Sequence, residues 1–238
     1  MLITDYAIVL NTKKFGDTSK IISVYTKENG KLSLIAKGAR NSKSKYGASL
    51  EPLSYNKISY YLYHNKDLHL LSTSEFNTHF KYLSDSMDHL TSALAVIESI
   101  SLSQEQYHKN EELFNLIIDT LTFLNEIKSN PFSTYVKFQI ALMNFLGFGL
   151  KFDSNYIVFQ DDVYINIEKG ELDNSRTGFK MYKINFNKMK YLSENSISDS
   201  AKVEFDDISA HRIAGFINRY FQHHLDKHYF INSLGMFE

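Results

Sequence analysis

Residues 37–47 (KGARNSKSKYG) have the composition of a phosphate-binding loop. They include four cationic side chains within nine residues, and no acidic residue stands between Glu28 and Glu51. Arg and Lys supply charge to phosphate oxygens, while Ser hydroxyls and backbone N–H groups supply directed hydrogen bonds. Three earlier lysines, around the first long loop we expect, can extend the same face. The predicted nucleic-acid-binding residues are Lys13, Lys14, Lys20, Lys37, Arg40, Lys43 and Lys45.

Aromatic side chains accompany these cations and could carry unstacked bases, because every base has a face that an aromatic ring can cover. The alternative is a solvated basic loop whose neighbouring tyrosines belong to a folded core. Charge distribution bears on the choice. Residues 1–80 hold 11 Lys and Arg against 6 Asp and Glu, a net charge of +5, whereas residues 81–238 hold 15 against 21, a net charge of −6. The tyrosines concerned are Tyr25, Tyr46, Tyr60, Tyr61 and Tyr63.

Short strands must position these residues. Segments rich in Ile, Val, Leu, Tyr and Thr alternate as half-buried strands do. Glu28-Asn29-Gly30 predicts a hairpin turn, and residues 64–67 predict a second one. Five short strands would leave exposed edges in a flat sheet, so we expect a closed five-stranded barrel of the OB type. The predicted strands are 4–10, 20–26, 31–37, 55–63 and 68–74.

The pattern becomes helical after residue 74. Ser72-x-x-Glu75 resembles a capping box, and Asn130-Pro131 resembles an N-cap followed by proline in the first helical position. The segment 156–175 predicts a β-hairpin, and 206–227 predicts a last helix. The sequence therefore predicts an α+β protein: an OB-type DNA-binding domain at 1–80, followed by a helical domain at 81–238 with a small β-hairpin insertion.

Several functional classes are disfavoured. The chain has no Cys, so it has no disulfide, thiol nucleophile or cysteine-ligated zinc. Phosphate-loop, dinucleotide-binding, hydrolase and zinc-protease motifs are missing, and we expect a protein that is not an enzyme and needs no cofactor. His224 and His228 could share a helix face and bind a metal, but partly exposed histidines on a helix flank are the more economical interpretation. No signal peptide or membrane span is recognisable, so we expect a soluble, cytoplasmic protein.

Particular motifs carry a family resemblance. They are GDTSKI at 16–21, YTKENGKLS at 25–33, KGAR at 37–40, Lys43-Ser44 and Leu50-Glu51-Pro52. The chain resembles the RecO family of bacterial recombination mediators, with Asp17 in place of the family's usual Glu. The specific motifs lie in about the first 55 residues, and fainter similarity continues to the end.

The resemblance implies an OB barrel with a helical domain that binds single- and double-stranded DNA, anneals strands and helps load recombinase in RecF-type repair, near the nucleoid. It implies a RecR-type partner and the C-terminal tail of single-strand-binding protein, for which Lys137, Arg212 and Arg219 are possible contacts. The alternative is an OB-fold adaptor that binds acidic protein tails without acting on DNA. Many members carry a four-cysteine zinc ribbon near 156–175. This chain has none, so we expect that segment to fold without metal.

Overall fold

The computed structural model describes residues 1–78, 80–152, 161–226 and 228–237. They form two compact units. The first unit is Met1–Lys81 with Ile97–Ile118, and the second is Tyr82–Val96 with Asp119–Glu238. Helices α1 (Met87–Ser103) and α2 (Glu111–Leu124) therefore contribute residues to both units. In the described part of the chain, no helix is long and apolar enough to cross a membrane.

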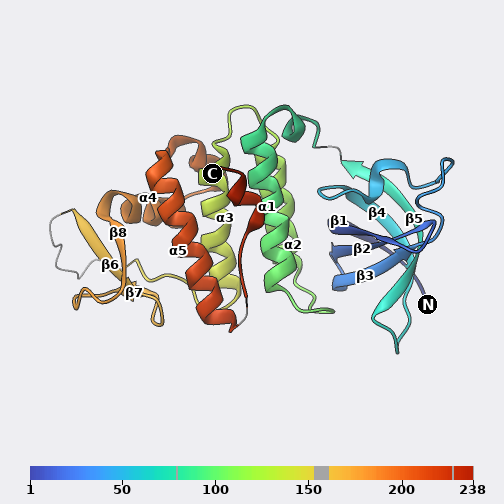
Figure 1. Ribbon diagram of the computed structural model, residues 1–238, viewed down its shortest axis with the longest axis horizontal. Helices are drawn as coiled ribbons and strands as arrows, with labels where there is room; N and C mark the ends of the chain where they lie inside the picture. Colours follow the sequence, from blue (N-terminus) through green and yellow to red (C-terminus); the bar gives the residue numbers. More distant parts are fainter. Residues whose placement is uncertain (79, 153–160, 227, 238) are drawn as a thin grey trace. The chain divides into compact units, whose positions relative to one another are not determined.

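Five strands close into a barrel in the first unit, as Figure 1 shows. Their order around the barrel is β1-β2-β3-β5-β4, and every neighbouring pair is antiparallel except β3 and β5. The predicted five-stranded barrel of the OB type is confirmed. A short 3₁₀ helix, η1 (Gly47–Leu50), precedes β4. The strands are β1 (Leu2–Phe15), β2 (Ser19–Thr26), β3 (Gly30–Ala36), β4 (Tyr55–Tyr61) and β5 (Leu68–Thr78).

Alternation of side chains explains these strands. In β3 the residues Leu32, Leu34 and Ala36 are buried in the barrel, while the residues between them are half-buried. Both predicted turns are confirmed, since β2–β3 and β4–β5 are antiparallel pairs. Gly30 has a φ of +64°, a conformation that glycine adopts without a Cβ penalty.

Two strands are longer than the alternation predicted. β1 continues to Phe15, so Lys13 and Lys14 lie on a strand and not in a loop. β5 continues to Thr78, and the predicted capping box at Ser72 and Glu75 was wrong because both residues lie within this strand, where Glu75 pairs with Lys57 and Ser72 lies at a register shift. Local polar composition misled both predictions, because strand pairing extends through polar residues where one face remains solvated.

Residues 97–118 seal one side of the first unit. The Lys31 ammonium donates to the carbonyl oxygens of Ser101 at 2.5 Å and Gln104 at 3.1 Å. Ion pairs join Lys109 to Glu28 at 2.6 Å and Lys27 to Glu111 at 3.0 Å. A backbone bridge pairs residue 31 with residue 106. The barrel is thus completed by a segment that follows it in the sequence.

The second unit is mainly helical. Its central helix, α3 (Pro131–Phe145), begins as predicted, with the Asn130 side chain accepting from the Ser133 N–H. The last long helix, α5 (Asp207–Leu225), is capped in the same way by Asp206 and ends two residues before the predicted limit. Helix α4 (Lys183–Glu194) was not predicted. The shorter 3₁₀ helices are η2 (Lys81–Asp85), η3 (Ile197–Lys202) and η4 (Asn232–Phe237).

A three-stranded sheet beside α4 corresponds to the predicted hairpin insertion (Figure 1). It consists of β6 (Asp162–Asn166), β7 (Glu171–Leu172) and β8 (Phe179–Tyr182), in the order β7-β6-β8. The β6–β7 hairpin is confirmed, whereas residues 156–160 of the predicted segment lie outside the described residues. Buried Val163, Ile165 and Met181 give this sheet an apolar face.

Candidate nucleic-acid interface

The basic loop, residues 37–46, connects β3 to η1 and is folded by its own backbone. The Asn41 N–H donates to the Gly38 oxygen at 3.2 Å, and the Ser44 N–H donates to the Asn41 oxygen at 3.0 Å. Tyr46 fixes the end of the loop, because its buried ring lies in the barrel core and its hydroxyl donates to the Leu71 oxygen at 3.0 Å. The loop is therefore a set of turns attached to the barrel, with its cations facing solvent.

Arg40 joins the basic loop to the hairpin between β1 and β2. Its Nη1 donates to the Gly16 oxygen at 2.8 Å, and its backbone N–H donates to the Thr18 oxygen, also at 2.8 Å. The hairpin carries Lys13 and Lys14 on its first strand. Two segments separated by some twenty residues are thus held side by side, and both carry exposed cations.

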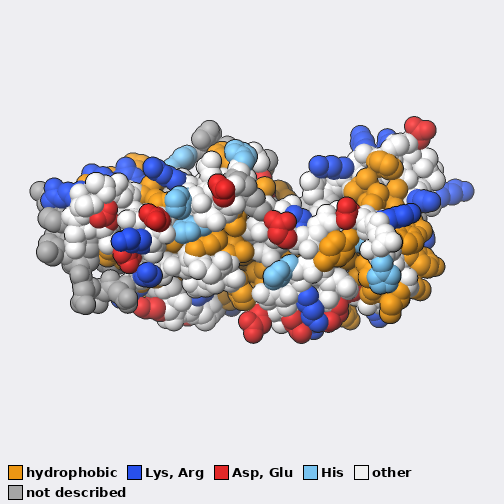
Figure 2. All heavy atoms as spheres, turned by 90° about the horizontal axis from the view of Figure 1, so that it is seen from below, with side chains coloured by type: hydrophobic (Ala, Val, Ile, Leu, Met, Phe, Trp, Pro, Cys, Tyr) orange, Lys and Arg blue, Asp and Glu red, His pale blue; other side chains and the backbone are white. Residues whose placement is uncertain are grey.

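Six of the seven predicted cations lie on these two segments and are exposed. None of them forms an ion pair with a described residue. Figure 2 shows Lys and Arg side chains projecting from the barrel, with hydrophobic side chains exposed among them. We call these six residues the basic rim: Lys13, Lys14, Lys37, Arg40, Lys43 and Lys45.

Lys20 differs from the other six predicted residues. It lies half-buried on β2, and its ammonium is 2.6 Å from a Glu51 carboxylate oxygen. Its charge is therefore compensated within the barrel. The pairing could not be read from the sequence, because the partner lies 31 residues away.

The tyrosines divide into a buried group and an exposed group, and only buried Tyr46 lies beside the basic rim, with the Lys45 ammonium 5.2 Å from its ring centroid. Tyr25, Tyr46 and Tyr60 are buried, so for these three the alternative of core tyrosines is confirmed and their rings are not available to bases. Burial raises the pKa of Tyr25 to about 12. Tyr61 and Tyr63 are exposed, but Tyr61 pairs with Leu2 at the opposite end of β1 from Lys13 and Lys14.

One exposed ring does accompany the basic rim. Phe15 is the last residue of β1 and is 49% exposed. It directly follows Lys13 and Lys14 and precedes Gly16, whose carbonyl accepts from Arg40. Phe15 was not among the residues predicted to bind nucleic acid. The signal was present, however, because a phenylalanine directly after two lysines and before a glycine is an unusual candidate for a core position.

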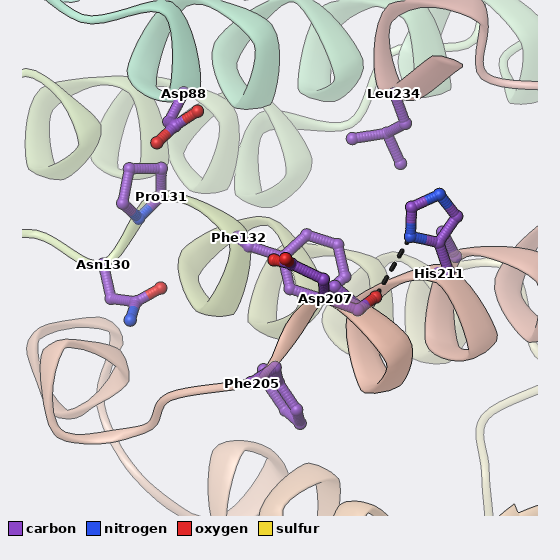
Figure 3. A pocket seen from close by; sticks show the side chains of 10 residues that line it. Asp88, Asn130, Pro131, Phe132, Phe205, Asp207, His211 and Leu234 are labelled. Carbon is purple, nitrogen blue, oxygen red and sulfur yellow. Dashed lines mark hydrogen bonds between the residues drawn. The ribbon is translucent and has the colours of Figure 1, made fainter. Parts of the chain in front are cut away.

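The second unit contains a cavity of about 510 Å³ at the start of α3 and α5, seen in Figure 3. Phe132 and Phe205 meet edge to face there, with ring centroids 5.8 Å apart. Asp88 and Asp207 contribute carboxylates that form no ion pair with a described residue. This combination suits a cationic or neutral apolar group and repels an acidic peptide. The lining residues are Asp88, Asn130, Pro131, Phe132, Phe205, Asp207, Ala210, His211, Ala214 and Leu234.

A second, open depression lies on the neighbouring part of α5. Ile208 is 69% exposed there, and Arg212, one turn further along the helix, lies over the Tyr182 ring at 4.8 Å. Of the other two cations considered for an acidic tail, Arg219 is exposed, while burial lowers the pKa of half-buried Lys137. Arg212 therefore combines a charge with exposed apolar neighbours.

His224 and His228, considered above as possible metal ligands, are not arranged to bind one. His224 stacks on Phe148 with ring centroids 4.7 Å apart, and its Nε2 lies 2.9 Å from the Ile167 oxygen. His228 lies beyond the end of α5, so the two do not share a helix face. In the part of the chain that the structure describes, no three His, Asp or Glu residues gather as metal ligands.

The loop between β7 and β8 is organised around one carboxylate, that of Asp173. The Asp173 carboxylate accepts from the Ser175 N–H at 2.8 Å, the Ser175 hydroxyl at 2.6 Å and the Thr177 hydroxyl at 3.0 Å. Since the sequence offers no cysteine thiolates, a zinc ribbon does not fit these residues. Hydrogen bonds to one carboxylate organise the turn.

Comparison with known proteins covers almost the whole chain. The family model described as "Recombination protein O N terminal" matches residues 1–80, and "Recombination protein O C terminal" matches residues 84–230. The chain is 27% identical to a protein named DNA repair protein RecO from Clostridium perfringens, over 82% of each chain. It is 24% identical to the protein of that name from Chloroherpeton thalassium, over 92% of each. It is 31% identical to the Salinibacter ruber protein, over 59% of this chain and 54% of that one.

Proposed function

The chain belongs to the RecO family, and on that premise we propose that it is a non-enzymatic DNA repair protein, a recombination mediator that binds DNA on the basic rim. The observation that carries the proposal is the joining of two basic segments by Arg40, which gathers six exposed cations that no described carboxylate neutralises. Exposed, unpaired cations on neighbouring segments are what a polyanion requires.

Strand annealing follows from this surface without covalent chemistry. Two DNA strands repel each other, and cations that neutralise phosphates on both strands lower that repulsion. Contacts to phosphate leave base edges free to pair, so sequence preference is weak. Phosphate contacts also release counterions, which makes affinity fall as salt rises. We propose that the protein binds single and double strands and anneals complementary ones by this means.

Protein partners belong to the second unit in this proposal. For the acidic, apolar tail of single-strand-binding protein we propose the depression beside Ile208 and Arg212, because it offers an exposed apolar residue next to a cation. Asp207 lines both this depression and the neighbouring cavity, but the cavity adds the Asp88 carboxylate and has no Lys or Arg in its lining, so it suits such a tail less well. We also propose that the protein binds a RecR-type mediator, helps to load recombinase and acts at the nucleoid. The domain boundary we propose remains near residue 80.

The decisive experiment removes two charges from the basic rim. Lys43→Ala with Lys45→Ala should weaken DNA binding and reduce the slope of log affinity against log salt by up to about 2. Arg40 is retained because it holds the hairpin. A matched control, Lys128→Ala with Lys169→Ala, removes two exposed charges from the second unit. Equal effects of the two pairs would place the DNA surface elsewhere.

Annealing distinguishes the mediator from an adaptor. We expect the protein to accelerate pairing of complementary strands, both naked and coated with single-strand-binding protein, and the Lys43/Lys45 variant to be slower on both. An adaptor for acidic tails would lack affinity for naked DNA and would act only on coated strands. That result would favour the alternative, in which the basic rim receives a protein tail.

A further inference from the structure

Phe15 presents a ring that the fold of the first unit does not use. It is absent from the barrel core and makes no ring–ring or cation–π contact with a described residue. Single exposed apolar residues are common on protein surfaces and carry no meaning alone. This one stands within the basic rim, directly after Lys13 and Lys14. A polyanion bound there would therefore come close to an uncovered aromatic face.

We propose that Phe15 stacks on an unpaired nucleobase of a single strand whose phosphates lie on the basic rim. The inference rests on the proposed DNA binding and adds to it a residue that recognises single strands. Stacking tolerates any base, since each has a π face, and so preserves the weak sequence preference expected for annealing. In a duplex these faces are covered by neighbouring base pairs, and Phe15 then has nothing to stack on.

The local structure holds the backbone of Phe15 in position. Pairing between β1 and β2 continues to Phe15 opposite Ser19. Beyond it, Arg40 binds the Gly16 and Thr18 carbonyls at 2.8 Å each, so the turn is attached to the basic loop. A ring on an ordered hairpin loses little conformational freedom on binding, and more of the stacking energy appears as affinity.

Phosphate contacts and stacking then have separate effects. The basic rim neutralises phosphates of single and double strands alike, so it sets the overall affinity and its salt dependence. Phe15 contributes only where a base is unpaired. Preference for single strands over duplex is accordingly assigned to one side chain, which makes the proposal testable by substitution.

The chain contains no tryptophan, so Phe15→Trp introduces a single indole. In this variant, oligo(dT) should quench the indole emission by stacking, while an abasic oligonucleotide of equal length should not. Binding of both oligonucleotides is followed independently by the anisotropy of a label on the DNA. The control is Tyr61→Trp. Tyr61 is an exposed residue of β4 that pairs with Leu2, at the opposite end of β1 from Phe15, and the emission of this variant should not respond.

Phe15→Leu supplies the affinity test. Loss of stacking should reduce single-strand affinity by roughly five-fold or more, with duplex affinity and melting temperature unchanged. Equal losses for both forms of DNA would overturn the proposal and assign the ring to the hairpin's structure. Emission from the Phe15→Trp variant that ignores bound oligo(dT) would also overturn it, while leaving the proposed function intact. Absence of DNA binding by the unmodified protein would refute both.

Discussion

Arg40 serves structure and charge at once. Its guanidinium donates one hydrogen bond to Gly16 and remains exposed, so its charge is still available to an anion. The contact to Thr18 comes from the backbone N–H, so it does not depend on the side chain. Arg40 therefore both holds the two segments of the basic rim together and contributes a charge to it. For this reason, the effect of an Arg40 substitution on DNA binding requires a separate measurement of folding.

Tyr46 is a residue whose effect on folding can be separated from DNA binding. Tyr46→Phe removes the hydroxyl that donates to the Leu71 oxygen and leaves a buried acceptor without its partner. We expect the free energy of unfolding to fall by about 1–2 kcal/mol. Urea denaturation measures this loss. DNA affinity at low salt should stay unchanged, and a large loss of affinity would indicate that the hydroxyl positions the basic loop.

At the residue scale, the sequence indicated where cations gather but not which of them are free. Lys37, Arg40, Lys43 and Lys45 could be predicted because they share one short loop. The pairing of Lys20 with Glu51 depends on how β2 meets the segment before β4, which no local pattern encodes. Phe15 was missed because its exposure depends on the unexpected length of β1.

At the scale of elements, alternation and turn residues predicted the barrel well, because each strand has one buried face. The helical prediction failed at α4, whose sequence KINFNKMKYLSE is mostly polar. Its buried residues Phe186, Met189 and Leu192 recur every third position, so the signal existed but was too short to stand out. Packing against α3, β6 and β8 stabilises this helix beyond what local propensity provides.

The β7–β8 loop gives an element-scale prediction about acid stability. Hydrogen bonds from the Ser175 hydroxyl and N–H, followed by Thr177, hold the pKa of Asp173 below its usual range. A lowered pKa stabilises the fold above the unfolded-state value of about 4, and this contribution is lost as pH falls through the folded-state pKa. Asp173→Asn should therefore flatten the decline of melting temperature with falling pH.

The control for that prediction is Asp119→Asn, whose exposed carboxylate makes no hydrogen bond to a described residue. It should leave the acid profile of the protein unchanged. A chelator should also leave the melting temperature unchanged, because no cysteine is available in this segment to hold zinc. Stoichiometric zinc in the purified protein, or equal effects of the two substitutions, would contradict this account of the loop.

At the scale of the whole molecule, ion pairs and hydrogen bonds decide which cations of residues 1–80 remain available to an anion. Lys27 and Lys31 are engaged by residues 101–111, which leaves the basic rim as the larger group of unpaired cations in the first unit. The sequence could not predict that residues 97–118 join the barrel, since nothing in a helical pattern states what its face contacts. Only the fold brings these segments together.

Substitutions at Gly30 and Gly47 can show how closely residues 97–118 pack against the barrel. A Cβ at Gly30 would lie 2.3 Å from the His108 carbonyl oxygen, whereas one at Gly47 would meet nothing within 4 Å. Both have positive φ, so Gly→Ala strains the backbone by roughly 1 kcal/mol at either position. Gly30→Ala should cost a further 1–3 kcal/mol or so from overlap. Urea denaturation compares the two, and equal costs would mean that residue 108 yields freely.

Because residues 97–118 follow the five strands in the sequence, the barrel is synthesised before the segment that seals it. All five strands have left the ribosome well before this segment, so the nascent barrel passes through a stage in which Lys31 has no carbonyl partners from Ser101 and Gln104. At translation rates of roughly 5–20 residues per second, the ~37 residues between Lys81 and Ile118 take about 2–7 seconds. During that interval the uncovered side of the barrel is open to nascent-chain chaperones, and codon usage across this stretch governs how long it stays so.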